Sequence, residues 1–264
     1  MRTGDALRLT AVLAAALVLA ACGLEDYPFI YPVPQGSIRQ YATTRSEVPI
    51  PTNNAGTTFT HFIVFYRIYV SDVLVSATSS SSSYSAINQD LLTDYNAIFP
   101  YIDSTTLVNT NMETLFLGRK FQYLYLQGAD IDDVLSSGVL GRTLVFDFPS
   151  GRYPTLTIDG AVYNLYRSNG NGTFDLQPKL ETQPLWYRYF VNSSDLSSSA
   201  YSYTPTNTTQ NADVVNNSGA SSYTYAAMYI AAMGVDNSTY TNIYSTPSLI
   251  HVFLLPDQWQ QQQQ

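Results

Sequence analysis

The chain has 264 residues, of which 45% are hydrophobic and 12% are charged, so it can bury a core and is not disordered throughout. It carries 12 lysines and arginines against 20 aspartates and glutamates, and no basic cluster, which excludes a protein that binds nucleic acid through its charge. A single cysteine excludes a disulfide framework within the chain.

The first 21 residues predict a secretory signal peptide. Arg2 and Arg8 form a basic start, and the apolar run 9–21 that follows is shorter than the roughly 20 residues a membrane-spanning helix needs. Its removal takes away two basic residues and Asp5, leaving 10 basic and 19 acidic side chains and a net charge of −9.

The apolar run ends in Leu19-Ala20-Ala21-Cys22. These residues resemble a bacterial lipobox, and the resemblance implies cleavage before Cys22, diacylation of its sulfur with fatty acids such as palmitate, and acylation of the new amine. Two or three acyl chains anchor a protein durably, because each buried methylene contributes about 0.8 kcal/mol. We therefore expect Cys22 to be a lipidation site and the folded part to hold no thiol. The alternative is a short buried helix that ends in cysteine.

The residues after Cys22 bear on location. Gly23 stands where the lipoproteins of enteric bacteria retained at the inner membrane have Asp, so the resemblance favours the outer membrane. The segment Gly23-Leu24-Glu25-Asp26-Tyr27 is similar to the start of uncharacterised spirochaete lipoproteins. Three prolines among residues 22–40 predict an extended tether.

The strongest element of the body is a strand over Phe59–Asp72. Apolar residues from Phe62 to Val70 alternate onto one face, which we expect to face the core. The other face is mostly apolar too, so the strand is predicted to be central and covered on both sides. The serine run Ser79–Ser83 predicts a loop.

One helix follows. Ser85 is the expected N-cap, and Pro100 is expected to end the helix. Its apolar residues fall on one face: Ile87, Leu91, Leu92, Tyr95, Ile98 and Phe99.

Further strands are predicted from β-branched and aromatic runs. Asp159-Gly160 predicts a tight hairpin, because this dipeptide adopts positive φ angles readily. The polar stretch Asn192–Ser222 predicts a long surface loop, with a short strand near Ala200–Thr204. The expected strands are Thr114–Leu117, Phe121–Leu126, Thr143–Phe148, Thr155–Ile158, Ala161–Arg167, Leu185–Val191, Tyr223–Met233 and Leu249–Leu255.

Parts of the body resemble a fibronectin type III module. Tyr225 with the alanines after it, Ser245-Thr246-Pro247 and the terminal apolar strand resemble its last two strands, and Ile63–Ser71 resembles its third. We expect a mainly β protein, an antiparallel fibronectin type III or immunoglobulin-like sandwich with one inserted helix and long polar loops. The expected organisation is a signal peptide 1–21, a tether 22–40, one β-rich domain 41–256 with an insertion at about 73–222, and a disordered tail 257–264.

Candidate chemistry is sparse. His61 and His251 each lie in an apolar strand without a carboxylate at ligand spacing, so core histidines are expected, which would face each other if their strands are neighbours. Asp130, Asp132 and Asp133 form an acidic cluster that suits a solvated turn or, alternatively, glycoside hydrolysis by paired carboxylates. The loop 169–175 places oxygen side chains at every second residue, as a Ca²⁺ loop does, but it has one carboxylate only, so a plain Gly/Asn turn is expected.

The sequence therefore predicts no catalytic residue, no metal ligand and no cofactor, with Cys22 as the single site residue. The 22 tyrosines suit either half-buried sheet faces or a recognition surface displayed on long loops. The expected function is a lipid-anchored envelope protein that binds a partner protein or a glycan or has a structural role, without nucleic acid. The alternative is an envelope-associated hydrolase acting on carbohydrate.

Overall fold

The computed structural model describes residues 29–56, 58–76, 80–102, 111–126, 128–149, 154–166, 214–215 and 223–255. Several predictions from the sequence lie outside these residues: the signal peptide, Cys22, the loop 169–175, the strand 185–191, the short strand 200–204 and the tail 257–264. The elements in chain order are η1 (Gln35–Ser37), β1 (Arg39–Tyr41), β2 (Arg45–Pro49), β3 (Phe59–Ser71), α2 (Ser81–Ile87), α3 (Gln89–Ile98), η2 (Phe99–Tyr101), α4 (Met112–Leu117), β4 (Gln122–Tyr123), β5 (Tyr125–Leu126), α5 (Ile131–Val134), η3 (Ser137–Val139), β6 (Thr143–Asp147), β7 (Thr155–Ile158), β8 (Ala161–Tyr166), β9 (Val214–Val215), β10 (Tyr223–Asp236), β11 (Thr241–Tyr244) and β12 (Ser248–Leu255).

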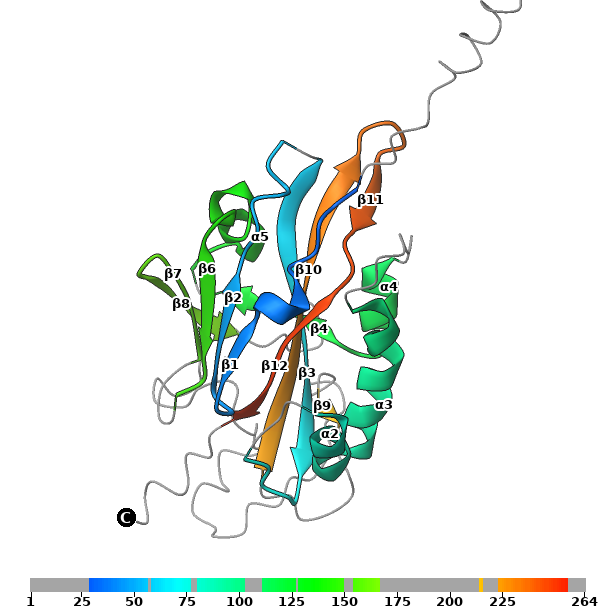
Figure 1. The fold of residues 1–264 in the computed structure, drawn as a ribbon, viewed down its shortest axis with the longest axis vertical. Helices are drawn as coiled ribbons and strands as arrows, with labels where there is room; N and C mark the ends of the chain where they lie inside the picture. Colours follow the sequence, from blue (N-terminus) through cyan, green and yellow to red (C-terminus); the bar gives the residue numbers. More distant parts are fainter. Residues whose placement is uncertain are drawn as a thin grey trace, which may run out of the picture.

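Two sheets face each other, which confirms the predicted mainly β sandwich (Figure 1). The first sheet has the order β1-β2-β6-β7-β8-β5, and all its pairs are antiparallel. The second has the order β11-β10-β3-β4, with β12 also on β10 and β9 on β3. β3 and β9 form the one parallel pair among the described strands. The three segments that resemble a fibronectin type III module, β3, β10 and β12, are adjacent strands of this second sheet.

Strand β3 is covered on both faces, as its two apolar faces predict. Phe62, Val64, Tyr66 and Ile68 belong to the core between the two sheets. Phe65 and Tyr69 point the other way, into a second core under α2, α3 and α4. The molecule therefore has three layers: the first sheet, the second sheet and the helices.

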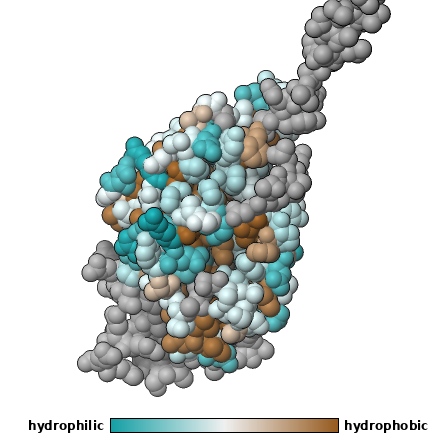
Figure 2. Space-filling view, viewed as in Figure 1, coloured by the Kyte–Doolittle hydropathy of each residue, from teal (hydrophilic) through white to brown (hydrophobic). Residues whose placement is uncertain are grey.

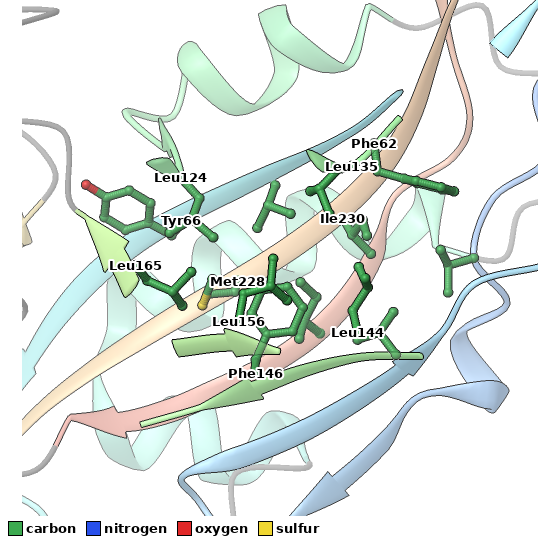
Figure 3. Close-up of a cluster of buried hydrophobic side chains, with 14 of the residues drawn as sticks. Phe62, Tyr66, Leu124, Leu135, Leu144, Phe146, Leu156, Leu165, Met228 and Ile230 are labelled. Carbon is green, nitrogen blue, oxygen red and sulfur yellow. The ribbon is translucent and has the colours of Figure 1, made fainter. Parts of the chain in front are cut away.

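The core between the sheets is built from side chains of both (Figure 3). Leu144, Phe146 and Leu156 of the first sheet lie against Met228 and Ile230 of β10. All five are fully buried. Burial of one large aliphatic or aromatic side chain contributes roughly 1.5–3 kcal/mol to the stability of the fold. This contact therefore holds the two sheets together.

The prediction of a loop over Ser79–Ser83 was wrong, because α2 begins at Ser81. The Ser80 hydroxyl accepts a hydrogen bond from the Ser83 amide and caps the helix, while Tyr84 and Ile87 bury one face. Serine has little capacity to pack, but it is among the preferred helix caps, and the apolar residues that follow stabilise the turn.

The predicted single helix is two helices. Asn88 ends α2 and caps α3, since its side-chain oxygen accepts from the Asp90 amide and its nitrogen donates to the Val70 carbonyl. Ser85 is therefore inside a helix and not its cap. Pro100 lies in the 3-10 turn η2 that continues from α3.

The expectation of one inserted helix was wrong, because the described part of the chain contains four α-helices, of which α4 and α5 lie outside the predicted helix. The expected strand Thr114–Leu117 is helix α4, whose cap Asn111 accepts from the Thr114 amide. The expected strand Phe121–Leu126 is two short strands, β4 on β3 and β5 on β8, so this segment passes from one sheet to the other.

The hairpin at Asp159-Gly160 is confirmed, with φ angles of +49° and +85°. β6, β7, β10 and β12 also lie where the sequence predicts strands. Strands β1, β2 and β11 were not predicted, and β9 lies within the predicted loop Asn192–Ser222.

Candidate functional site

The three aspartates of the predicted acidic cluster have different partners. Asp130 caps helix α5, since its side chain accepts from the Asp132 amide at 3.0 Å. The Asp132 carboxylate lies 3.4 Å from Nε2 of His61, and the Asp133 carbonyl accepts from the Ser136 hydroxyl at 2.8 Å. The structure thus places the cluster at a helix start, as the solvated-turn interpretation predicts, and it brings His61 to Asp132.

Partial burial shapes the His61–Asp132 pair. The Asp132 side chain is 58% exposed and that of His61 is 15% exposed. Partial burial raises the pKa of Asp132, and the charge of His61 opposes that rise. At this pair an imidazole meets a carboxylate.

The two histidines do not face each other, because β10 lies between β3 and β12. The ring of His251 lies edge-on to Phe253, and its Nε2 is 2.9 Å from the carbonyl oxygen of Ala42. Burial lowers the pKa of His251 to about 4, although the hydrogen bond to Ala42 acts in the other direction. The neutral ring donates this hydrogen bond to a backbone carbonyl and so joins β12 to the segment between β1 and β2.

A buried ionic cluster joins β3 to α3, and the sequence analysis missed it. Asp94 has a side chain only 7% exposed, and its carboxylate accepts from the Tyr69 hydroxyl at 2.7 Å and from Arg67 Nη1. Arg119 Nη1 lies 3.4 Å from the second carboxylate oxygen. Burial and the charge of Asp94 raise the pKa of Tyr69 well above its usual value, so its phenol stays a donor.

The sequence does carry a signal for this cluster. Asp94 stands three residues after Leu91 and four before Ile98, on the buried face of α3. Arg67 stands two residues before Tyr69 on the helix-covered face of β3. A charged residue on each of two apposed apolar faces indicates a buried ion pair, because an unpaired charge there would be costly.

Several of the described tyrosines belong to the hydrophobic cores and so are not available for a recognition surface. Tyr66, Tyr69, Tyr225 and Tyr229 are fully buried. The Tyr225 hydroxyl donates to the Val73 carbonyl and accepts from the Val75 amide, which fixes the segment after β3. The described tyrosines with large exposure are Tyr31, Tyr41 and Tyr240.

Residues 29–41, which we call the N-terminal clasp, pack on β12. Ile30 and Val33 are buried, and the Ser248 hydroxyl donates to the Val33 carbonyl. The Gln35 side chain pairs with Leu249 as a neighbouring strand would, donating to its carbonyl at 2.9 Å and accepting from its amide at 2.7 Å. The expectation that residues 22–40 form an extended tether is wrong for the described residues 29–40, because hydrophobic burial and hydrogen bonds hold them to the body.

The clasp continues into the first sheet along the same edge of β12. Gln40 donates to the Ile250 carbonyl at 3.0 Å, and the Ser46 hydroxyl lies 3.2 Å from the same oxygen. The Leu254 amide donates to the Thr43 carbonyl at 2.7 Å. Hydrogen bonds from several residues between 33 and 46 therefore connect the clasp and the start of the first sheet to β12.

No protein-family model, curated protein or solved structure matches the chain. Among the described residues, no helix is long and apolar enough to span a bilayer. The same part of the chain holds no group of three or more side chains placed to ligate a metal ion.

Proposed function

We propose that this chain is a lipid-anchored protein of the cell envelope, attached to the outer membrane through acylated Cys22, and that its body has a non-enzymatic binding or structural role. The observation that carries the proposal is the N-terminal clasp. A protein held by its amino terminus transmits any force on the anchor to the first folded residues, and here these residues are joined to a central sheet.

The spacing between anchor and clasp supports the same proposal. Cys22 stands seven residues before Phe29, a span of at most about 25 Å even when fully extended. The anchor and the body are thus close neighbours, and the sequence between them is too short for a free tether.

Metabolic labelling with a palmitate analogue tests the anchor. The full chain is expected to incorporate the label, and Cys22→Ser is expected to abolish incorporation and release the protein from membranes. Asn237→Cys, which adds a thiol on an exposed turn, is the matched control and should leave labelling unchanged. A mature amino terminus other than Cys22, or equal labelling of Cys22→Ser, would contradict the proposal.

Protease treatment of intact cells then distinguishes the two faces of the outer membrane. Cleavage of the body on intact cells would support contact with a host or neighbouring cell. Resistance that ends when the outer membrane is opened would support a periplasmic structural role.

The His61–Asp132 pair favours a second candidate function, a carbohydrate hydrolase. A carboxyl group with a raised pKa beside an imidazole is a candidate acid–base pair, and Asp130 and Asp133 lie near enough to affect Asp132. Turnover of chromogenic glycosides that is lost in Asp132→Asn and kept in Asp159→Asn would support the enzyme. Equal turnover in both variants would reject this pair as its site.

A further inference from the structure

The end of the body that follows the anchor exposes aromatic rings. Phe29 and Tyr31 are each 40% exposed, and their rings form an edge-to-face pair with centroids 4.8 Å apart. Tyr240, in the turn between β10 and β11, is 85% exposed. We call these three residues the aromatic end.

Contacts place the three rings on one end of the sandwich. The Tyr31 backbone exchanges two hydrogen bonds with the Asn54 side chain, at 2.8 and 2.9 Å. Ile30 packs so closely on Gly234 that a Cβ there would lie 2.7 Å from it, and the Val235 amide donates to the Thr58 carbonyl. The clasp, the segment before β3 and the β10–β11 hairpin therefore meet, and Figure 1 shows the hairpin beside the start of β3.

The three segments that form this end carry little charge, although the acidic turn of Asp132 lies beside His61 and Arg142 lies beside Ile50. Asp236 is the single charged residue in the ranges 29–38, 51–60 and 234–244, whereas 12% of the whole chain is charged. The Asp236 carboxylate is already satisfied by the Ser238 amide and hydroxyl and by the Thr239 hydroxyl. A surface of aromatic rings, serine, threonine and asparagine resembles in composition the belts that membrane proteins place at the headgroup level.

We propose that the aromatic end seats the body end-on in the headgroup layer of the bilayer that holds the lipid anchor. The inference rests on the proposed acylation of Cys22, which keeps Phe29 within about 25 Å of the membrane surface. The aromatic rings enter the interface, and the absence of charged residues from 29–38, 51–60 and 237–244 keeps the desolvation cost of that entry low.

A second group of exposed hydrophobic residues lies at the opposite end. Figure 2 shows hydrophobic residues gathered over the end of β3, the strand that Val73 and Leu74 follow. β3 and β10 are antiparallel, so this end is about 40 Å from the β10–β11 turn along 13 residues of strand. It would touch the bilayer if the body lay on its side, which separates the two orientations experimentally.

Spin labelling of the full-length acylated protein in phosphatidylcholine vesicles tests the seating. One thiol is introduced at Asn237 in the aromatic end or at Leu74 at the far end, and nitroxide collisions with an aqueous nickel chelate are measured. Seating predicts a collision rate roughly threefold or more lower at position 237 than at 74. Equal exposure at both positions, or protection at both, would overturn it.

Two variants connect the result to the rings. Phe29→Ser, Tyr31→Ser and Tyr240→Ser together are expected to remove the protection at 237. The control Val73→Ser, Phe99→Ser and Val162→Ser, which replaces exposed rings and aliphatic chains elsewhere, should keep it. Protection that survives the first triple variant would overturn the role of the rings.

The unsubstituted chain reports on the anchor itself. It should take up no label, because its one cysteine is acylated. Labelling of that chain would overturn the anchor and the seating together. If the parent takes up no label and the variants labelled at positions 237 and 74 show equal collision rates, the seating alone would be overturned.

Discussion

At the residue scale, the buried ionisable groups hold layers together. Asp94 joins the helix layer to β3 through Arg67 and Tyr69, and Arg119 approaches the same carboxylate from beyond α4. His251 joins β12 to the segment that links β1 and β2. Each group therefore connects two layers of the fold through its side chain.

Asp94→Asn is expected to lower the free energy of unfolding by about 3 kcal/mol, because two guanidinium groups lose their counter-charge in a buried site. Urea denaturation at neutral pH measures the change. Asp90→Asn, an exposed aspartate in the first turn of the same helix, is the control and should cost about 0.5 kcal/mol through the helix dipole. Equal losses in the two variants would contradict the role of the cluster.

His251 predicts a loss of stability at acid pH. Its pKa is about 4 in the folded protein and 6.5 for an ordinary histidine, so the unfolded state binds more protons between these values. Stability contributed by the neutral ring is full above about pH 6.5 and is lost as pH falls toward 4, by about 3 kcal/mol. His251→Gln keeps a donor for Ala42 and should flatten the curve; an unchanged slope between pH 7 and 4.5 would refute this assignment.

At the element scale, the clasp turns the edge of β12 into an interior position. Gln35 supplies both a donor and an acceptor to Leu249, as a paired backbone residue would. The segment between Ser248 and Leu254 therefore belongs to both sheets, although its formal pairing is with β10 alone.

Gln35→Ala should free the Leu249 amide and lower stability by about 1–2 kcal/mol, since two hydrogen bonds to a buried strand are lost. Native-state hydrogen exchange at Leu249 is the measurement, and exchange there should rise at least tenfold, a change of 1.4 kcal/mol. Gln89→Ala, on the exposed side of α3, should leave that amide unchanged.

The period-two pattern of β3 and the apolar runs of β10 and β12 predicted strands correctly, because long apolar segments of this kind have to be buried in a layered protein. Helix α4 was misread, because six residues are too few to separate the two periods and the Asn111 cap decided the outcome. The clasp was hidden by its prolines, which favour extended chain but do not say what it packs against. The pairing of Asp94 with Arg67 could not be predicted, because it depends on the packing of α3 against β3.

At the scale of the whole molecule, one sheet separates two cores. The residues of β3 and β10 alternate between them, so neither core exists without these strands. The fold should therefore unfold as one unit.

Leu156→Ala in the first core and Phe116→Ala in the second should each lower the free energy of unfolding, by about 2–5 and about 3–5 kcal/mol. Phe116 stacks on Phe65 at 4.4 Å and also contacts Tyr229, so its loss reaches both strands. Far-ultraviolet circular dichroism and tyrosine fluorescence should report one coincident transition in both variants. Separate transitions would show that the layers unfold independently.

The closed edge of β12 has a consequence for crowding. At high local protein density an open strand invites pairing between neighbouring molecules and growth of ordered aggregates. Here glutamine and serine side chains occupy the places a second chain would take. Removing them would expose a row of backbone donors and acceptors, and the same change that loosens the clasp would make neighbouring copies adhere.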